Sequence, residues 1–227
     1  MLRPIIWLAT VALIALGVNA CTTRAGDEQQ EAKARTLPES GQDLSPGEYR
    51  TEVFEPALSF TVGKGWTLEC PEGPDFVCLF PPGGQTRLRF VNVDEVYEPS
   101  ELVDMSGKTT PPPEDLVGWL ERHPYLKTDK PEPVRVGGIE GQQLDVVAAD
   151  LPKSYPEGLC VSDCVQLSVF SDGDDWAVEE GNKNRFTILE DVKGETVVID
   201  FSSPAAWFDE SWPEAEKVLG TVEWRGT

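Results

Sequence analysis

The chain has 227 residues, of which 40 are acidic and 19 are Lys or Arg, so its formal net charge at pH 7 is −21. A surface this negative repels the phosphate backbone of nucleic acids and gains no electrostatic attraction to anionic lipid headgroups. The composition therefore argues against nucleic-acid binding and leaves membrane attachment to a covalent or apolar anchor. High acidity is also a common adaptation for solubility, and by itself it does not indicate a particular partner.

The first 20 residues have the pattern of a bacterial lipoprotein signal peptide. Arg3 supplies a positive start, and an apolar run follows from Ile5 to Val18. This run is shorter than the about 20 apolar residues that span a bilayer. It ends in the letters VNAC, which fit the lipobox of bacterial lipoproteins apart from the Asn. We therefore expect cleavage after Ala20 and attachment of a lipid, with palmitate, to Cys21. Plain secretion after the same cleavage and a retained, uncleaved anchor are the alternatives.

Cysteine usage supports this assignment. The chain has five cysteines, and an odd number leaves one unpaired thiol in an oxidising compartment. Lipidation of Cys21 leaves Cys70, Cys78, Cys160 and Cys164, which form two couples that each bracket a turn. Four cysteines allow three pairings, and the local disulfides Cys70–Cys78 and Cys160–Cys164 are the simplest. A four-cysteine zinc site is disfavoured, because the gap between Cys70 and Cys78 is longer than the spacers of zinc knuckles.

Residues 22–48 contain no aromatic residue and are rich in Glu, Gln, Ala, Ser and Pro. Such a composition does not bury enough apolar surface to fold. We therefore expect three regions: a signal peptide at 1–20, a lipid-anchored flexible linker at 21–48 and a single globular domain at 49–227. The linker has a mean reach of about 30 Å. The protein is expected outside the cytoplasm, anchored to the bacterial cell membrane by its N-terminal lipid.

Short strands with turns between them make up most of the globular region. Leu58, Phe60 and Val62 alternate with polar residues, as in a half-buried strand. Comparable apolar or alternating segments, bounded by Gly, Pro, Asp or Ser, predict further strands. These segments are 66–68, 76–80, 88–93, 133–136, 143–148, 165–169, 176–178, 185–189, 196–201 and 221–224.

Two helices are predicted between the strands. The first has Leu116, Trp119 and Leu120 on one face, with three prolines in its first turn and Pro124 at its end. The second opens with a capping box from Ser211 to Glu214 and ends at Gly220. The sequence thus predicts an α+β domain, a twisted antiparallel sheet with two or more helices packed on it.

The order of these segments resembles a known group of proteins. It includes a lipoprotein leader, a polar linker and the stretches FEPALSFTVGKGW, PPPEDLVGWLERHP, PVRVGGIEGQQLDV and WPEAEKVLGTVEW. This order resembles uncharacterised surface lipoproteins of actinobacterial type and, more distantly, the PsbP-like α/β/α sandwich. The resemblance implies a fold and a location. Its motifs are turns and caps, so it carries no functional residue to this chain.

No catalytic motif stands out in the sequence. The one histidine, His123, lies at the predicted end of the first helix, and no Gly-x-Ser-x-Gly sequence accompanies it. We interpret it as a helix-end residue that interacts with the last carbonyls. The acids Asp172, Asp174 and Asp175 are interpreted as a solvated turn and not a calcium site, because their spacing does not match an EF-hand loop. No catalytic residue, metal or cofactor is expected.

Aromatic residues near the second helix offer one surface of interest. Trp207 and Trp212 flank its start among acidic residues, where they would either present an aromatic surface to a sugar or partner or fill the core. The sequence therefore favours a non-enzymatic envelope lipoprotein that binds an envelope protein or a small ligand. The alternative is an envelope-acting hydrolase that uses carboxylates the sequence does not identify.

Overall fold

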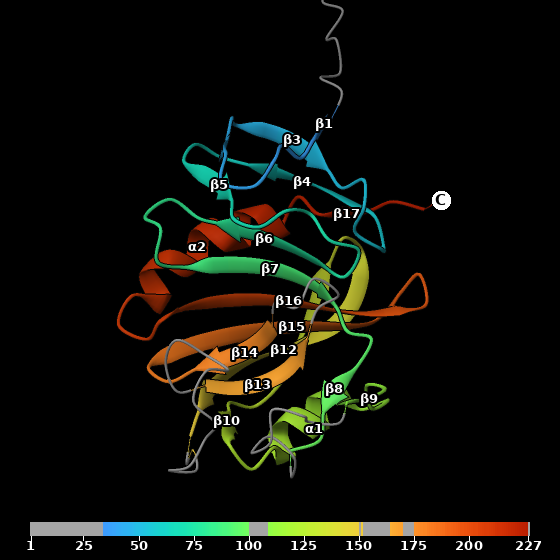
Figure 1. Ribbon diagram of the computed structural model, residues 1–227, viewed down its shortest axis with the longest axis vertical. Helices are drawn as coiled ribbons and strands as arrows, with labels where there is room; N and C mark the ends of the chain where they lie inside the picture. The colour runs from blue at the N-terminus through green and yellow to red at the C-terminus, as the bar shows by residue number, and fades with distance from the viewer. Residues whose placement is uncertain (1–33, 100–108, 150, 152–163, 170–174, 227) are drawn as a thin grey trace, which may run out of the picture. The chain divides into compact units, whose positions relative to one another are not determined.

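The computed structural model describes residues 34–99, 109–149, 151, 164–169 and 175–226, all within one compact unit. Its largest element is a nine-stranded sheet in which every neighbouring pair is antiparallel. The order is β10 (Leu126–Thr128), β12 (Ile139–Ala148), β15 (Asn182–Val192), β16 (Glu195–Pro204), β7 (Arg87–Asn92), β6 (Phe76–Phe80), β5 (Trp66–Leu68) and β2 (Asp43–Leu44), with β11 (Glu132–Val136) paired to β12. Figure 1 shows these strands following one another from β12 to β5.

Three smaller strand groups accompany this central sheet. A four-stranded sheet has the order β1 (Arg35–Thr36), β3 (Gly47–Arg50), β4 (Leu58–Val62) and β17 (Glu223–Trp224). A hairpin is formed by β13 (Cys164–Val169) and β14 (Asp175–Glu179), and a short pair by β8 (Val96–Tyr97) and β9 (Thr109–Thr110). The two helices are α1 (Leu116–Arg122) and α2 (Phe208–Leu219). The predicted α+β class, an antiparallel sheet carrying helices, is confirmed. Neither helix, nor any other in the described part of the chain, is long and apolar enough to cross a membrane.

Each face of the central sheet is covered by a separate apolar core, because the side chains of a strand alternate between faces. One core joins Phe90, Ile199 and Phe201 of the sheet to Phe60 of β4 and Phe208 of α2. The other core joins the opposite face to α1 and the β13–β14 hairpin, and its sheet members include Phe76, Val91, Leu144, Phe186, Ile188 and Val198. The strands in the middle of the sheet are therefore buried on both sides.

The folded region starts earlier than the predicted boundary at residue 49. Strands β1 and β2 and the start of β3 lie in the segment expected to be a flexible linker. Leu44 is buried and pairs with Trp66 of β5. The Arg35 guanidinium lies 4.4 Å from the centre of the Tyr49 ring and donates to the carbonyls of Ser45 and Pro46. Leu44 and this cation–π contact explain why a segment without aromatic residues is nevertheless ordered.

Both helix starts also differ from the prediction. Helix α1 begins at Leu116, after the prolines, and the Asp115 side chain caps it by accepting from the Gly118 N–H at 2.7 Å. Helix α2 begins at Phe208, so Ser211 lies inside it and the predicted capping box is absent. Pro213 consequently sits in the helix, where it cannot donate an i→i−4 hydrogen bond. The acids Asp209 and Glu210 of the first turn complement the helix dipole instead.

A buried ion pair lies on the α1 face of the central sheet. Asp200 of β16 is fully buried, and its Oδ2 accepts from Arg89 Nε at 3.2 Å and from Nη2 at 2.7 Å. Its Oδ1 accepts from Asn184 Nδ2 at 2.8 Å. Burial raises the pKa of Asp200, and the Arg89 guanidinium opposes that effect. The charges of Arg89 and Asp200 compensate each other, so removal of one partner leaves an uncompensated buried charge.

We predict a strong, non-additive effect of breaking this pair. Arg89→Met should lower the free energy of unfolding by about 3–5 kcal/mol, because Asp200 then has no cation beside it. The double variant Arg89→Met/Asp200→Leu should be more stable than the single one, since no buried charge remains. Urea unfolding of wild type, Arg89→Met, Asp200→Leu and the double variant tests this. A double variant as unstable as the sum of the two single losses would contradict it.

Candidate functional site

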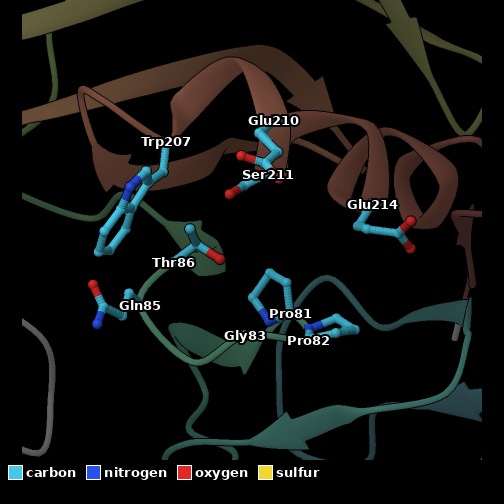
Figure 2. A pocket seen from close by; sticks show the side chains of 9 residues that line it. All are labelled: Pro81, Pro82, Gly83, Gln85, Thr86, Trp207, Glu210, Ser211 and Glu214. Carbon is cyan, nitrogen blue, oxygen red and sulfur yellow. The ribbon is translucent and has the colours of Figure 1, made fainter.

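A groove lies beside the first turns of α2. Its volume is about 410 Å³. One wall is the turn between β6 and β7, and the other is the exposed side of α2 (Figure 2). The lining residues are Pro81, Pro82, Gly83, Gln85, Thr86, Trp207, Glu210, Ser211 and Glu214.

Helical periodicity produces the α2 wall. Trp207, Glu210, Ser211 and Glu214 are three or four positions apart, so they share one side of the helix. The opposite side is apolar and enters the core through Phe208, Ala215, Val218 and Leu219. Burial of that second stripe fixes the rotation of the helix. The polar stripe with Trp207 therefore points into the groove.

The facing wall is a tight turn. The letters PPGG at 81–84 connect β6 to β7, and the Gly84 N–H donates to the Pro81 carbonyl at 3.3 Å. Gly83 and Gly84 have φ values of 107° and 72°, which favour glycine. Pro82 and Gln85 are exposed, whereas Thr86 is buried at the start of β7. The turn thus supplies two proline side chains and the polar side chains of Gln85 and Thr86.

Trp207 is the most unusual residue of the groove. It is 45% exposed, one of two large hydrophobic side chains with high exposure among the residues described. Trp212, only five positions away, instead packs edge-on against Phe201 with ring centres 5.4 Å apart and lies under the Arg185 guanidinium at 4.6 Å. The two tryptophans considered together in the sequence therefore have different roles. Trp212 belongs to the core, and Trp207 faces the groove.

The groove offers hydrogen-bond acceptors and an aromatic face. Figure 2 shows Trp207 and Gln85 at one end and Glu214 near Pro82 at the other. Lys217 pairs with Glu214 at 2.6 Å on an exposed part of the helix. Glu210 adds a second carboxylate to the same wall. This arrangement suits a ligand that donates hydrogen bonds and has an apolar face, and it disfavours an anion.

The predicted cysteine sites fall partly outside the described residues. Cys21 and Cys160 lie there, so lipidation and the Cys160–Cys164 bridge stay predictions; Cys164 itself is buried at the start of β13. Cys70 and Cys78 are thiols in the structure, but their sulfurs and a Glu69 carboxylate oxygen all lie within 4.8 Å of one another. The structure thus brings the first couple together, and their disulfide also stays a prediction.

The structure describes the predicted acidic turn only in part, from Asp175 onward. Asp172 and Asp174 lie outside the described residues. Glu179 accepts from Asn182 at 3.2 Å and lies 3.6 Å from Arg87. Among the residues searched, Glu69, Cys70 and Cys78 are the one group of three potential metal ligands.

His123 lies at the end of α1 as predicted, where its backbone N–H donates to the Leu120 carbonyl at 3.2 Å, but its side chain is buried. It is 3% exposed, its Nδ1 accepts from the Tyr125 N–H at 3.3 Å, and its ring meets Trp119 edge-on at 5.2 Å. The ring is therefore an acceptor and does not donate to the helix carbonyls through this nitrogen. Its Nε2 has no hydrogen-bond partner among the residues described. Burial lowers the pKa of His123 from 6.5 to about 4.

This lowered pKa predicts a loss of stability in mild acid. Between pH 6.5 and about 4, His123 is protonated in the unfolded chain but stays neutral in the folded chain. The free energy of unfolding should therefore fall by about 2–3 kcal/mol across that range. His123→Gln should show a correspondingly smaller fall, while carboxylate titration is shared by both proteins. Urea unfolding at pH 7 and pH 4.5 measures the difference, and equal pH dependence in both would refute it.

Comparison with known proteins gives distant matches of fold. No protein-family model and no curated protein matches the chain. The solution structure of cyanobacterial PsbP (CyanoP) from Synechocystis sp. PCC 6803 is similar with a TM-score of 0.40 and 12% identity, over 83% of this chain and 99% of that one. LpqN of Mycobacterium tuberculosis, a protein involved in cell envelope biogenesis, is similar with a TM-score of 0.34 and 11% identity, over 82% of this chain and 88% of that one.

Proposed function

We propose that this chain is a lipid-anchored, extracytoplasmic binding protein that holds a neutral, polyhydroxylated ligand of the cell envelope in the Trp207 groove. The exposed Trp207 indole in a concave, polar site is the observation that carries the proposal. An indole exposed inside a concave, polar site offers a ligand both a large apolar face and an N–H donor. The leader that ends at Cys21 supports the location.

The chemistry of the groove favours a sugar-like ligand. The indole face packs on the C–H groups of a pyranose ring, and the carboxylates of Glu210 and Glu214 accept from its hydroxyls. Gln85, Thr86 and Ser211 both donate and accept. A net charge of −21 disfavours phosphorylated or uronic-acid ligands. Neutral hydroxyl groups meet all of these conditions.

The placement of the acids favours binding over hydrolysis. Glycoside hydrolysis needs two carboxyl groups that flank the scissile bond. Glu210 and Glu214 project from one side of the same helix, and the lining residues of the opposite wall, Pro81 to Thr86, include no carboxylate. A ligand in the groove would therefore meet both acids on the same side. We infer that the ligand is held and not cleaved.

The anchor is tested by replacing Cys21. The Cys21→Ser variant has no thiol for the lipid, so most of the protein should move from the membrane fraction to the soluble extracytoplasmic fraction. Fractionation and immunoblotting of cells that express either form measure this. Wild-type protein should be recovered from membranes with a diacylglyceryl group on Cys21 by mass spectrometry. A Cys21→Ser protein that stays in the membrane fraction with its leader removed would contradict the lipid anchor.

The groove is tested with neutral oligosaccharides released from the envelope by partial acid hydrolysis. Trp207→Ala should weaken their binding about tenfold or more, equal to about 1.4 kcal/mol, because the stacking face is lost. Val53→Ala is the matched control, since Val53 is the other largely exposed hydrophobic side chain and lies outside the groove. Isothermal titration calorimetry at 0.15 M salt measures the affinity. Equal affinity of the Trp207→Ala and wild-type proteins contradicts the site, and growth of reducing ends during incubation contradicts binding without turnover.

A further inference from the structure

The two thiols near the end of β5 differ sharply in their surroundings. Leu68 pairs with Leu79, and the Glu69 N–H donates to the Cys78 carbonyl at 2.9 Å, so Glu69 lies directly opposite Cys78. Side chains opposite each other in an antiparallel pair share a face of the sheet. The next residue, Cys70, comes after the strand has ended, in a bend. Its sulfur therefore joins the same cluster, with all three ligand atoms within 4.8 Å.

Access distinguishes one thiol from the other. Cys78 is 3% exposed, whereas Cys70 is half-buried. The Cys78 thiol donates to Glu69 Oε2 at 2.7 Å. A hydrogen bond with Cys70, burial and the charge of Glu69 raise the pKa of Cys78, while Arg89 opposes them, so Cys78 rests as a protonated thiol. Cys70 is therefore the more accessible of the two thiols.

Glu69 is held in place to act as a base for the Cys78 thiol. Arg87 Nε lies 3.5 Å from its Oε1, which leaves Oε2 toward the Cys78 thiol. Arg89 is the residue paired with Cys78 on β7, so a positive charge also lies near the sulfur. A cation near a developing thiolate stabilises it.

The surrounding loop is anchored without a disulfide. Glu72 Oε1 accepts from the backbone N–H groups of residues 52, 53 and 54 at 2.7, 2.6 and 2.9 Å. The Gly73 N–H donates to the Phe76 carbonyl, and the Asn92 N–H donates to the Asp75 carbonyl. These contacts are all present while Cys70 and Cys78 are thiols. These contacts hold the loop in place independently of a bond between the two sulfurs.

We propose that Cys70 and Cys78 form an exchanging dithiol–disulfide pair that reduces organic disulfides, with Cys70 as the attacking thiol and Cys78 as the resolving thiol. The Cys70 thiolate attacks one sulfur of a disulfide RS–SR, which forms the mixed disulfide Cys70–S–SR and releases RS⁻. Cys78 then gives its proton to Glu69, and its sulfur attacks the Cys70 sulfur and expels the second RS⁻. The two protons lost by the cysteines end on the two RSH products. Two electrons pass from the protein to the disulfide, independently of the Trp207 groove.

Oxidised glutathione is the probe for this reaction. The mature lipidated protein, in detergent and reduced, is mixed with it, quenched with acid and mapped by mass spectrometry. A glutathione adduct should appear first on Cys70 and then decay to a Cys70–Cys78 link. Cys78→Ser should trap the adduct on Cys70, and Cys70→Ser should slow modification of Cys78 at least tenfold. Reduced glutathione should reopen the link.

Glu69→Gln is the decisive variant. It should form the Cys70 adduct at the wild-type rate but resolve it at least tenfold more slowly. Glu179→Gln is its matched control, because Glu179 also lies beside Arg87 but is no member of the thiol cluster. Near-UV circular dichroism verifies the fold of each variant. If Cys78→Ser unfolds, the comparison of Glu69→Gln with Glu179→Gln still decides. The proposal is overturned if glutathione first modifies Cys78, or if the adduct resolves at the same rate in Glu69→Gln and wild type. It is also overturned if reduced glutathione does not open the Cys70–Cys78 link, or if both thiols hold a metal ion.

Discussion

Strand β16 carries Ile199 and Phe201 into one core and Asp200 into the other, so the middle of the central sheet meets water on neither face. A polar group placed there must find its partner inside the protein. Asp200 does so through Arg89 and Asn184, and this ion pair ties β7, β15 and β16 together on the α1 face. On the other face the apolar stripe of α2 is fixed against Phe201. The orientation of the groove wall follows from that second contact.

The same double burial explains why the two proposed sites lie at the margins of the sheet. The groove forms where the β6–β7 turn leaves the sheet and α2 begins. The thiol pair forms where β5 ends and the chain bends back toward β6. At such positions the backbone geometry is fixed by the core, while side chains still reach solvent. Trp207 and Cys70 are both exposed in part for this reason, although their neighbours Phe208 and Cys78 are buried.

The pattern of apolar residues predicted the main strands well, because a buried strand needs apolar side chains within its own short segment of sequence. The expected strands at 58–62, 66–68 and 76–80 coincide with β4, β5 and β6. Short strands such as β1 and β2 have no such pattern, and they exist only because Leu44 and Arg35 find partners on other strands. The start of α2 was misplaced because Ser211 and Glu214 match a capping box locally, whereas the burial of Phe208 extends the helix by one turn. The groove needs two segments more than 100 residues apart, so periodicity indicated its α2 wall but not its partner.

The central claim is that a neutral oligosaccharide occupies the Trp207 groove, and the indole N–H signals of the protein report this most directly. The six tryptophans that remain after Trp7 is removed with the leader give separate indole resonances in a ¹⁵N-labelled sample of the mature protein. On titration with a neutral envelope oligosaccharide, the Trp207 signal, assigned by its loss in Trp207→Phe, should shift progressively and saturate. The signals of the buried Trp66 and Trp176 should stay in place. A saturable shift confined to tryptophans outside the groove, or no shift of Trp207 at saturating ligand, would contradict the account.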